Sequence, residues 1–583
     1  MTNKGRAGVR ARHAVGMNKG WHDVSACLIS AGADKCQPRI ELWLKDRVLG
    51  QKHTGGSIAE VACLLKEKIS NRNSVFAESG TAYRPDEREK FLESKLGHLT
   101  EMKKRGLSLF FKRFNPNISF LTHHLAHAYA ATLLSPFRRS IIVVMDGAGS
   151  SQNAFDADDP ELKLAAGTHC RSQTPFDSCL EWFSVYLQDG KRLKCVDKQW
   201  ETFRQHKASG GFLADGLGMF YETAARYVFN SSFESGKIMG LAPFGQSRKI
   251  TDRVELYRRL DWKNAFSKRG KQTWERSSHR RAYSNLAASV QTCFEEQVFA
   301  LFRQIRTSYP DRKNIIFTGG SALNCVFNSK LLRSGLFSGV YIPPFPGDES
   351  ISVGAASYLW YNVMNREWTG CKTENQRANF GPVGSVPTEA EVQKRFAGYR
   401  LSKPRDLISE VVKLLADGKV VGWFQGRSES GPRALGYRSI LAAPGRPGMK
   451  DYLNNRIKGR ESFRPYGGTC LWEKTKDYFD VPADFDSPFM SFAPSVKKQY
   501  LVPLSQITHV DGTCRVQTVR RLQNPKFYAL IKAFGKTTGI YCVLNTSMNI
   551  MGRPIVETVE DALGFFKETP ADALVIGDLL VSR

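Results

Sequence analysis

Three of the chain's histidines lie close together in the segment THHLAHAYAA (122–131). Only 11 histidines occur among the 583 residues, so a local cluster of three needs a cause. Thr122 can cap a helix that runs through the following residues, which are good helix formers. In that helix His123 and His127 project from one face, because they are four residues apart, and His124 points elsewhere. Two neutral imidazoles one turn apart form half of a metal site, although the same spacing also arises from ordinary packing.

Two aspartates could supply the other half of such a site. Asp146 follows the apolar run IIVVM (141–145), and Asp348 lies in the Pro- and Gly-rich segment PPFPGDES (343–350). A side chain at the carboxyl end of a buried strand in an α/β sheet can face a ligand crevice. Two histidines and two carboxylates suit a divalent ion such as Fe(II), Mn or Zn, with coordination positions left open. Asp-Gly is also a common turn signal, so an ordinary turn remains the alternative at Asp146, and neither aspartate proves a metal site.

Glycine-containing segments are the next candidates for chemistry. They are SGKIMGLAPFG (235–245) and FTGGSALN (317–324), and we add to them WHDVSACLIS (21–30), which has no glycine but begins the first strand-like element. Glycine lets backbone N–H groups approach a phosphate, and the start of a helix favours negative charge. Together these segments predict a nucleotide cleft. Its candidate binding residues are Lys237, Gly319, Gly320 and Asn324.

Arginine, lysine and amide side chains gather in three segments of the C-terminal third, at 426–444, 454–468 and 543–558. Clustered cations beside glycine and proline turns can recognise several phosphate or carboxylate oxygens at once, although an arginine-rich loop is more often a plain surface. The candidate phosphate-binding residues of these segments are Arg427, Arg433, Arg438, Lys458, Arg460, Arg464, Asn545, Thr546 and Ser547.

The net charge of +28 favours a polyanionic partner, because each phosphate that a cation neutralises releases counterions. The insertion 262–283 interleaves basic and aromatic residues, a composition that can follow a phosphate backbone and stack on bases. The alternative is a solvated loop whose aromatic residues fix it to the core. The candidate nucleic-acid-binding residues are Lys268, Arg269, Lys271, Trp274, Arg280 and Arg281.

A chain of this length needs more than one core, and strand–turn–helix units such as NIIFTGGSALN (314–324) predict an α/β architecture. Residues 1–19 are basic and contain no acidic residue, which predicts a flexible tail. Residues 20–372 and 391–583 are expected to form a larger and a smaller α/β domain. The polar segment 373–390, rich in Gly and Pro, is expected to link them.

No run of about 18 apolar residues occurs, so no membrane span is expected. The N-terminal segment lacks the apolar core of a secretory signal. The 12 cysteines are scattered and include no CxxC pair, which argues against a disulfide framework or a zinc ribbon. These features predict reduced thiols and a cytoplasmic location.

Taken together, these segments resemble the signature blocks of the O-carbamoyltransferases, a family that includes the nodulation-factor and antibiotic carbamoyltransferases. The resemblance implies an actin/sugar-kinase-like N-terminal domain, similar to the tRNA threonylcarbamoyl transferases, and a smaller C-terminal domain that is carbamoyl-adenylate-forming (YrdC-like). From about residue 20 onward, the blocks are HHLAHAYAA, DGAGS, SGKIMGLAPFG, GGSALN, PGDES, SGPRALGYRSILA, KGRESFRPYG, THVDGTCRVQTV and LNTSMNIMGRPIV.

The resemblance also implies roles for individual residues. The family's metal ligands correspond to His123, His127, Asp146 and Asp348. The catalytic residues that it implies are His22 and Asp23, in a loop on the acceptor side, and Arg433 and Lys458, in an activation pocket with Arg438, Arg460, Asn545 and Ser547.

Three segments depart from the family pattern, and these departures concern the shape of the acceptor site more than the reaction. Asp46 and Arg47 in LKDRVLGQKHTGG (44–56) stand nearest to a Glu-Glu-Arg-like strand of the family. Met548 replaces a common aromatic residue, and Glu349 and Ser350 stand where glycine is frequent.

The predicted function is an O-carbamoyltransferase that uses ATP to convert carbamoyl phosphate to carbamoyl-AMP and carbamoylates an acceptor hydroxyl. Its cofactors would be ATP with Mg and a divalent metal, in first place Fe(II), with Mn or Zn as alternatives. The net charge suggests a hydroxymethylated pyrimidine in DNA, or a nucleotide, as acceptor. The alternatives are the hydroxyl of a sugar or natural product and, in another class, a non-catalytic nucleotide-binding regulator. No membrane partner is expected, and a homodimer is left open.

Overall fold

The computed structural model describes residues 12–18, 23–31, 38–53, 59–68, 74–79, 119–152, 161, 164, 178–206, 211–214, 216–250, 260–265, 270–368 and 386–583. The predicted residues His22, Lys268 and Arg269, and residues 373–385 of the expected linker, lie outside this described part.

The N-terminal region begins with a five-stranded sheet whose central strand lies in the segment expected to be a tail. Its strands, in spatial order, are β3 (Pro38–Leu44), β2 (Ser25–Ala31), β1 (His13–Asn18), β4 (Ser74–Ser79) and β5 (Ser119–Leu121). Strand β1 pairs antiparallel with β2 and parallel with β4. The prediction of a flexible tail over residues 1–19 is therefore wrong for residues 13–18, and the first strand precedes the segment 21–30. The apolar run HAVGMN is covered on both faces, which outweighs its basic surroundings.

Two helices cover the faces of this first sheet. Val15 and Met17 of β1 pack with Val61 and Leu65 of α2 (Ala59–Lys68) on one face. On the other face lies α14 (Ile351–Tyr358), and a Cβ at Gly16 of β1 would come within 1.9 Å of a backbone oxygen of that helix. The sheet and α14 therefore approach each other closely only because residue 16 has no side chain.

A second, six-stranded sheet carries the centre of the molecule. Its strands, in spatial order, are β11 (Gly339–Tyr341), β10 (Asn314–Thr318), β6 (Arg139–Met145), β7 (Ser178–Asp189), β8 (Arg192–His206) and β9 (Gly211–Leu213). Alternate residues of β6 face opposite sides, as the period of a strand requires. Ile142 and Val144 pack toward α6 (His123–Leu134), whereas Ile141 and Val143 face the core of α8 (Leu217–Phe229) and α12 (Arg280–Ser308).

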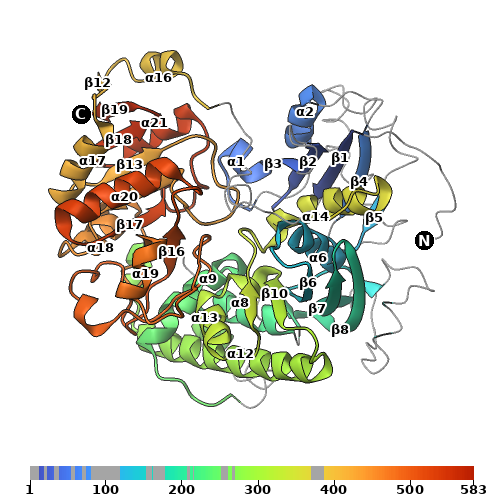
Figure 1. The fold of residues 1–583 in the computed structure, drawn as a ribbon. Coiled ribbons are helices and arrows are strands. Elements are labelled where there is room, and N and C mark those ends of the chain that lie inside the picture. The colour runs from blue at the N-terminus through green and yellow to red at the C-terminus, as the bar shows by residue number, and fades with distance from the viewer. Residues whose placement is uncertain are drawn as a thin grey trace.

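Helix α14 packs against α6 as well as against β1, so the two helices lie between the first and second sheets (Figure 1). A Cβ at Gly354 of α14 would lie 1.8 Å from the backbone oxygen of Ala126 in α6. The close approach of the two helix backbones at this point therefore depends on the missing side chain of Gly354.

The C-terminal region is built on an eight-stranded mixed sheet, drawn in orange and red in Figure 1. Helices α17 (Leu407–Ala416) and α20 (Pro525–Thr538) cover one face, where Trp423 and Val543 lie in a shared apolar cluster. In spatial order its strands are β12 (Arg400–Ser402), β19 (Leu579–Ser582), β18 (Ala573–Ile576), β13 (Val421–Phe424), β14 (Arg438–Ala442), β17 (Cys542–Ser547), β15 (Gly467–Leu471) and β16 (Val516–Val519).

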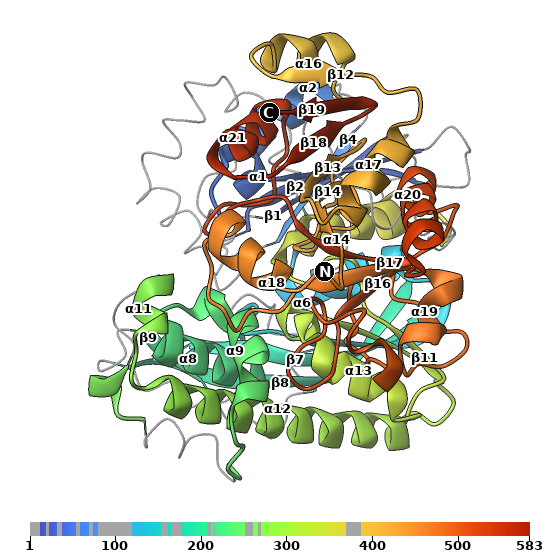
Figure 2. The same cartoon turned by 90° about the vertical axis from the view of Figure 1, so that its left-hand side faces the viewer.

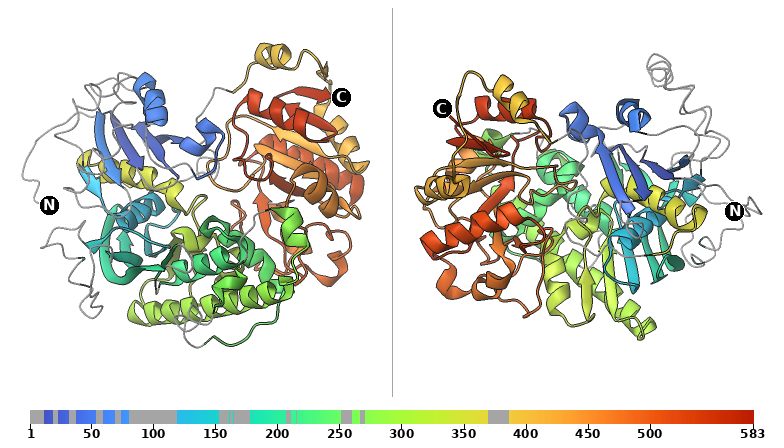
Figure 3. Two further views of the ribbon diagram at one scale, coloured as in Figure 1. Left: turned by 180° about the vertical axis from the view of Figure 1, so that it is seen from behind. Right: turned by 45° about the horizontal axis from the view of Figure 1, so that its top comes forward.

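The C-terminal sheet lies beside the N-terminal region, as the turned views show (Figures 2 and 3). The expected α/β class is confirmed. The domain boundaries at 372 and 391 stay a prediction, although α16 (Glu389–Arg395) already begins inside the expected linker, with Thr388 accepting a hydrogen bond from Glu391 N–H.

Two smaller expectations concern the membrane and the thiols. No helix within the described ranges is long and apolar enough to cross a membrane. Eight cysteines of the described part are free, but Cys179 is disulfide-bonded. The expectation of reduced thiols is therefore wrong at Cys179.

The contact between α14 and α6 gives the first test. Gly354→Ala should lower the free energy of unfolding by about 3 kcal/mol, because the new methyl group would overlap the Ala126 carbonyl. Gly564→Ala is the matched control, since Gly564 also lies in a helix, α21 (Val559–Glu568), but a Cβ added there would meet no neighbouring atom within 4 Å. The control should be stabilising by about 0.5–1 kcal/mol. Denaturant unfolding measures both, and equal stabilities of the two variants would contradict the proposed packing.

Candidate active site

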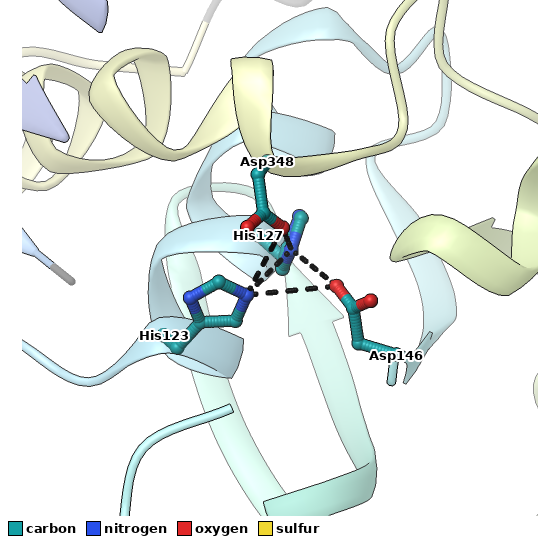
Figure 4. A group of neighbouring side chains, drawn as sticks. All are labelled: His123, His127, Asp146 and Asp348. Atoms are coloured by element: carbon teal, nitrogen blue, oxygen red, sulfur yellow. Dashed lines mark hydrogen bonds and ion pairs between the residues drawn. The ribbon is translucent and has the colours of Figure 1, made fainter. Parts of the chain in front are cut away.

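Two imidazoles and two carboxylates from three separate segments meet beside the start of α6 (Figure 4). His127 Nε2 lies 3.2 Å from His123 Nε2 and 3.0 Å from Asp146 Oδ2. His123 Nε2 lies 3.3 Å from Asp348 Oδ1. The structure thus brings together the four side chains that the helical spacing and the strand end pointed to, and their role as metal ligands stays a prediction.

The four side chains fit a single divalent ion. One ligand atom from each lies within 4.8 Å of the other three. Atoms that bind one ion at about 2.1 Å lie roughly 3–4 Å from one another, which is the spacing of the nearest pairs in this cluster. His127 Nδ1 lies 3.0 Å from Ser350 Oγ, a contact that holds the ring with Nε2 directed at the cluster. The mixture of imidazole and carboxylate suits iron(II), manganese or zinc and does not choose among them.

The start of α6 is fixed by residues far away in the sequence. Thr122 occupies the cap position, as expected, but its side chain makes no capping hydrogen bond. Instead His123 N–H donates to Ser150 Oγ at 2.9 Å, and His124 N–H donates to Glu181 Oε1 at 2.9 Å. The first turn, which carries His123, is therefore anchored to the loop after β6 and to β7.

His124 faces away from the cluster, as its position in the helix predicted. Its Nδ1 lies 2.8 Å from Ser184 Oγ. Burial lowers the pKa of His124 to about 3, more than the neighbouring Glu181 can offset. The ring is therefore neutral, and the ion pair of Glu181 with the buried Lys198 carries the charge of this region.

Charge balance holds the four-residue cluster together. Burial lowers the pKa of His123, but the carboxylates of Asp348 and Asp146 outweigh this and raise the pKa to about 10. Burial and Asp348 raise the pKa of Asp146, and hydrogen bonds to His123 and His127 more than reverse this, so that its pKa lies below the usual range. A divalent cation would supply the positive charge that these carboxylates need once the imidazoles are neutral.

Glycines leave room beside Asp146. Its Oδ1 accepts a hydrogen bond from Gly147 N–H at 2.7 Å, and a Cβ at Gly320 would lie 2.9 Å from the same oxygen. Gly319 has φ +87°, and its N–H donates to Pro346 O at 2.9 Å. The glycine turn at 319–320, which we interpreted as a phosphate loop, therefore packs against the end of β6 and Asp146. Its role with a nucleotide stays a prediction.

The described residue of the predicted acceptor loop, Asp23, lies next to the segment that carries Asp348. The amide of Asn18 donates to Asp23 O at 3.0 Å and to Asp348 O at 3.1 Å, which ties the two backbones together. His53 Nδ1 lies 3.5 Å from Asp23 Oδ1. Burial and the charge of Asp23 raise the pKa of Glu349 to about 8. The sequence reasoning missed Asn18, because it lay in the segment interpreted as a tail.

A second site lies in the C-terminal region, where cations gather around the buried Lys458. Lys458 Nζ donates to Ser547 O at 2.6 Å and to Ser547 Oγ at 3.3 Å, and it also contacts Asn549 Oδ1. Arg460 is held by Asn454 Oδ1 at 2.8 Å and lies over the ring of Tyr466. These contacts satisfy hydrogen bonds but add no negative charge to the pocket.

The cations of this pocket repel one another. Burial lowers the pKa of Lys458 well below its usual value, and the nearby charges of Arg460, Lys52 and Arg464 lower it further. Burial and the charge of Arg515 likewise lower the pKa of Arg433. Buried cations that are not paired with carboxylates stabilise a bound anion, because the anion supplies the missing countercharge.

Two of these cations were not singled out from the sequence. Lys52 lies in the loop after α1 (Lys45–Leu49), in the N-terminal region, and Arg515 lies just before β16. Arg515 Nε is buried and has no hydrogen-bond partner among the described residues. The block THVDGTCRVQTV contains Arg515, so this residue could have been selected, whereas the approach of Lys52 depends on contacts between the domains.

Other predicted pocket residues hold the chain itself. The guanidinium of Arg438 donates to Gln425 O at 3.0 Å and to Gly426 O at 3.1 Å, and it stacks 3.4 Å above the ring of Phe424. Asn545 Nδ2 donates to Ala434 O at 3.1 Å. These contacts shape the loop that contains Arg427 and Arg433, and direct contacts with a nucleotide stay predictions for Arg438, Asn545 and Thr546.

Lys237 and Asn324 also have partners within the protein. Lys237, in α9 (Ser235–Leu241), lies 2.7 Å from Glu461 Oε1 and 3.0 Å from Glu234 Oε1. Asn324 caps α13 (Cys325–Arg333) by accepting from Phe327 N–H at 3.1 Å. These partners occupy the polar atoms that would bind a nucleotide. The predicted nucleotide contacts of Lys237 and Asn324 stay predictions.

The basic insertion at 262–283 packs into the molecule through its aromatic residues. Trp274, in α11 (Lys271–Glu275), is 3% exposed and packs with Phe229, Tyr283 and Phe463. The prediction that Trp274 stacks on a base is therefore wrong, because the core covers its ring. Arg280 and Arg281 remain exposed, whereas Lys271 is bonded to Asn454 and Asn455 of the C-terminal region.

Comparison with protein families covers both regions. The model of the carbamoyltransferase N-terminus matches residues 58–357, and that of the carbamoyltransferase C-terminus matches residues 412–583. The chain belongs to the carbamoyltransferase family. This confirms the resemblance inferred from the signature blocks.

Relatives within the family include a nodulation protein and an antibiotic enzyme. The chain is 32% identical over 480 residues to nodulation protein NolNO of Sinorhizobium fredii (strain NBRC 101917 / NGR234), which covers 80% of this chain and 64% of that longer protein. It is 30% identical over 435 residues to 3'-hydroxymethylcephem-O-carbamoyltransferase of Amycolatopsis lactamdurans, which covers 72% of this chain and 79% of the relative. Among solved structures, full-length HypF in a phosphate- and nucleotide-bound form aligns at 12% identity with a TM-score of 0.34, over 60% of this chain and 47% of HypF.

The four-residue cluster yields a test of metal binding. His127→Ala should lower the affinity for a divalent ion by at least about 100-fold, since even residues that only support ligands change affinity by about 10–100-fold. Metal content after dialysis against defined Fe(II), Mn(II) and Zn(II) concentrations measures this. His124→Gln is the matched control, because His124 is equally buried in α6 but faces Ser184, and it should retain the ion. Equal metal contents of the two variants would refute a site at the cluster.

Proposed function

We propose that the chain is an ATP-dependent O-carbamoyltransferase that forms carbamoyl-AMP and passes its carbamoyl group to an acceptor hydroxyl. One observation carries the proposal: this chain, a member of the carbamoyltransferase family, has two polar sites of opposite charge preference. One is the cluster of His123, His127, Asp146 and Asp348, suited to a cation. The other is the pocket around Lys458, whose unpaired positive charges suit phosphates.

Activation would take place in the pocket around Lys458. Water releases phosphate from carbamoyl phosphate, and an oxygen of the resulting carbamate attacks the α-phosphorus of ATP, from which pyrophosphate leaves. Both steps develop negative charge on oxygens of leaving phosphates. Arg433, Lys458 and Arg460 offer fixed positive charge, so the chain does not need to reorganise as this charge develops.

Transfer would take place beside the His/Asp cluster. The acceptor oxygen attacks the carbamoyl carbon, AMP leaves, and the hydroxyl proton passes to a base. A divalent ion bound there would polarise the carbamoyl oxygen or hold the nucleotide phosphate. We assign the base to His22, since imidazole titrates near neutral pH, with Asp23 beside it. The position of Asp23 next to the Asp348 segment supports this assignment.

The finer features of the prediction belong to the same proposal. We assign an actin/sugar-kinase-like architecture to the N-terminal domain and a YrdC-like one to the C-terminal domain. Fe(II) is the proposed metal, with Mn or Zn as alternatives, and Mg accompanies ATP. The cytoplasmic location and a homodimer are also parts of this hypothesis.

The two sites should be separable by measuring the half-reactions. Lys458→Met should lower the release of pyrophosphate from ATP and carbamoyl phosphate by at least about 100-fold, because it removes a fixed cation from developing phosphate charge. His127→Ala should leave pyrophosphate release within about threefold of the unmodified chain but abolish transfer. Pyrophosphate is measured by a coupled assay and carbamoylated acceptors by mass spectrometry. If the unmodified chain releases no pyrophosphate, the alternative of a non-catalytic nucleotide-binding regulator replaces this proposal.

For the acceptor, we propose a hydroxyl on a polyanion, such as a hydroxymethylated pyrimidine in DNA or a nucleotide. The net charge of +28 and the exposed cations Arg276, Arg280 and Arg281 support this class. A base inside a duplex would have to be flipped out to reach the N-terminal site. The alternative acceptor is a sugar or natural-product hydroxyl, which needs no such charge.

A salt titration separates the two acceptor classes. Carbamoylation of hydroxymethylated DNA should fall by at least about tenfold between 50 and 200 mM salt, since each phosphate contact releases counterions. Arg280→Gln together with Arg281→Gln should weaken this dependence. Carbamoylation of a neutral sugar panel under the same conditions is the control. A sugar product with no DNA product would refute the polyanion proposal.

A further inference from the structure

Arg47, in the short helix α1, reaches from the N-terminal region into the C-terminal one. Its Nη2 donates to Gly431 O at 3.1 Å and to Glu429 O at 3.3 Å, and its Nη1 lies 3.4 Å from Glu557 Oε2. The side chain is buried, with an exposed fraction of 5%. Among the described residues, every side-chain hydrogen bond of Arg47 is made to the C-terminal region.

The loop that Arg47 holds contains the predicted activation residue Arg433. Glu429 Oε1 accepts from Leu435 N–H at 2.6 Å, which closes the loop on itself. Ser428 Oγ contacts both oxygens of Glu557, at 2.7 and 2.8 Å, so Glu557 links Ser428 to Arg47. The loop therefore has a rigid inner structure, and Arg47 fixes its position relative to α1.

The same loop touches the segment that leads to the His/Asp cluster. A Cβ at Gly431 would lie 2.5 Å from Pro344 O and 3.4 Å from Phe345 Cβ. Asp348 follows four residues after Pro344 in the chain. Residues 428–431 are thus held between Arg47 on one side and the Asp348 segment on the other, which is a second contact independent of the hydrogen bonds.

We propose that Arg47 is a positioning residue that holds the 428–436 loop against the N-terminal region, so that carbamoyl-AMP stays enclosed between its site of formation and the His/Asp cluster. The inference rests on the proposed function. Without the contact, water would reach the intermediate and cleave it to carbamate and AMP, with the added oxygen and proton coming from that water. Arg47 touches neither the phosphate pocket nor the four-residue cluster in any described contact, so it acts through the loop.

Arginine is suited to this task because its fork meets several acceptors at once. The two Nη atoms reach three acceptors, two of which are carbonyl oxygens of the loop. A lysine could replace the charge opposite Glu557 but could not reproduce the planar fork. The Arg47→Lys variant therefore separates the charge from the geometry.

Retention of the intermediate tests the proposal without knowledge of the acceptor. The full chain is mixed with ATP and carbon-labelled carbamoyl phosphate, then passed rapidly through a desalting column, while pyrophosphate is measured in parallel. The unmodified chain should release pyrophosphate and retain the label. Arg47→Ala should retain at least tenfold less label for each pyrophosphate that it releases, since small misplacements of such a loop cost up to about 100-fold. Arg47→Lys should fall between them.

Arg312→Ala is the matched control for a merely structural effect. Arg312 is also buried and binds a carbonyl, Gln188 O at 2.8 Å, and a carboxylate, Asp189, at 2.9 Å, but within the N-terminal region alone. This variant should lose thermal stability and still retain the label. Hydrogen exchange at residues 428–436 should accelerate in Arg47→Ala and stay unchanged in Arg312→Ala, which reads out the loop without any turnover.

Three outcomes would overturn the inference. Retention of label by Arg47→Ala at the level of the unmodified chain would show that the contact does not enclose the intermediate. Equal loss of label in Arg312→Ala would assign the effect to general stability. If the unmodified chain releases no pyrophosphate, the proposed function is refuted, and this inference with it. This outcome is distinguishable from the other two, because every variant then behaves alike.

Discussion

The close packing of α14 on α6 is the constraint on which the site depends. The turn that carries Asp348 leads directly into α14, and α6 carries both histidines. The distance between the helices therefore sets the distance from Asp348 to the imidazoles. Gly354 makes that approach possible, and Gly16 lets the first sheet press on the other side of α14. Small residues at these points decide where a carboxylate and two imidazoles can meet.

That packing has an electrostatic consequence. It places two carboxylates near each other, so that burial and the charge of Asp348 act to raise the pKa of Asp146, against the hydrogen bonds to His123 and His127 that bring it below the usual range. The imidazoles offset this repulsion, so the cluster is stable as imidazolium–carboxylate pairs or with a cation in their place. The pairing of imidazolium with carboxylate therefore keeps the four side chains together without a metal. A divalent cation could then replace the positive charge of the imidazolium groups.

The parts predicted well from the sequence were those fixed by local periodicity. The four-residue spacing of His123 and His127 required a shared face, and the apolar run before Asp146 required a buried strand. The segment 13–18 was misjudged, since its basic neighbours suggested a tail and its pairing with β4 joins residues far apart in the chain. Trp274 was misjudged for a similar reason, because its aromatic partners include Phe463 in the other region. Contacts between the two regions leave no periodic pattern in the sequence. These contacts decide which cations are paired within the protein and which remain free for a ligand.

The arginines illustrate this last distinction. The Nη atoms of Arg438 and Arg47 donate to backbone carbonyls, and Arg47 also pairs with Glu557, whereas Lys458 has only neutral acceptors and cationic neighbours among the described residues. In sequence both kinds look alike, as basic residues beside glycines. The first kind maintains the shape of a loop, and the second leaves positive charge for a ligand to neutralise. The segment from α1 to residue 53 contains one residue of each kind. Arg47 binds the 428–436 loop, and Lys52 of the N-terminal region adds positive charge beside Lys458 of the C-terminal region. In the proposed reaction, the activation step would therefore need the two regions in contact.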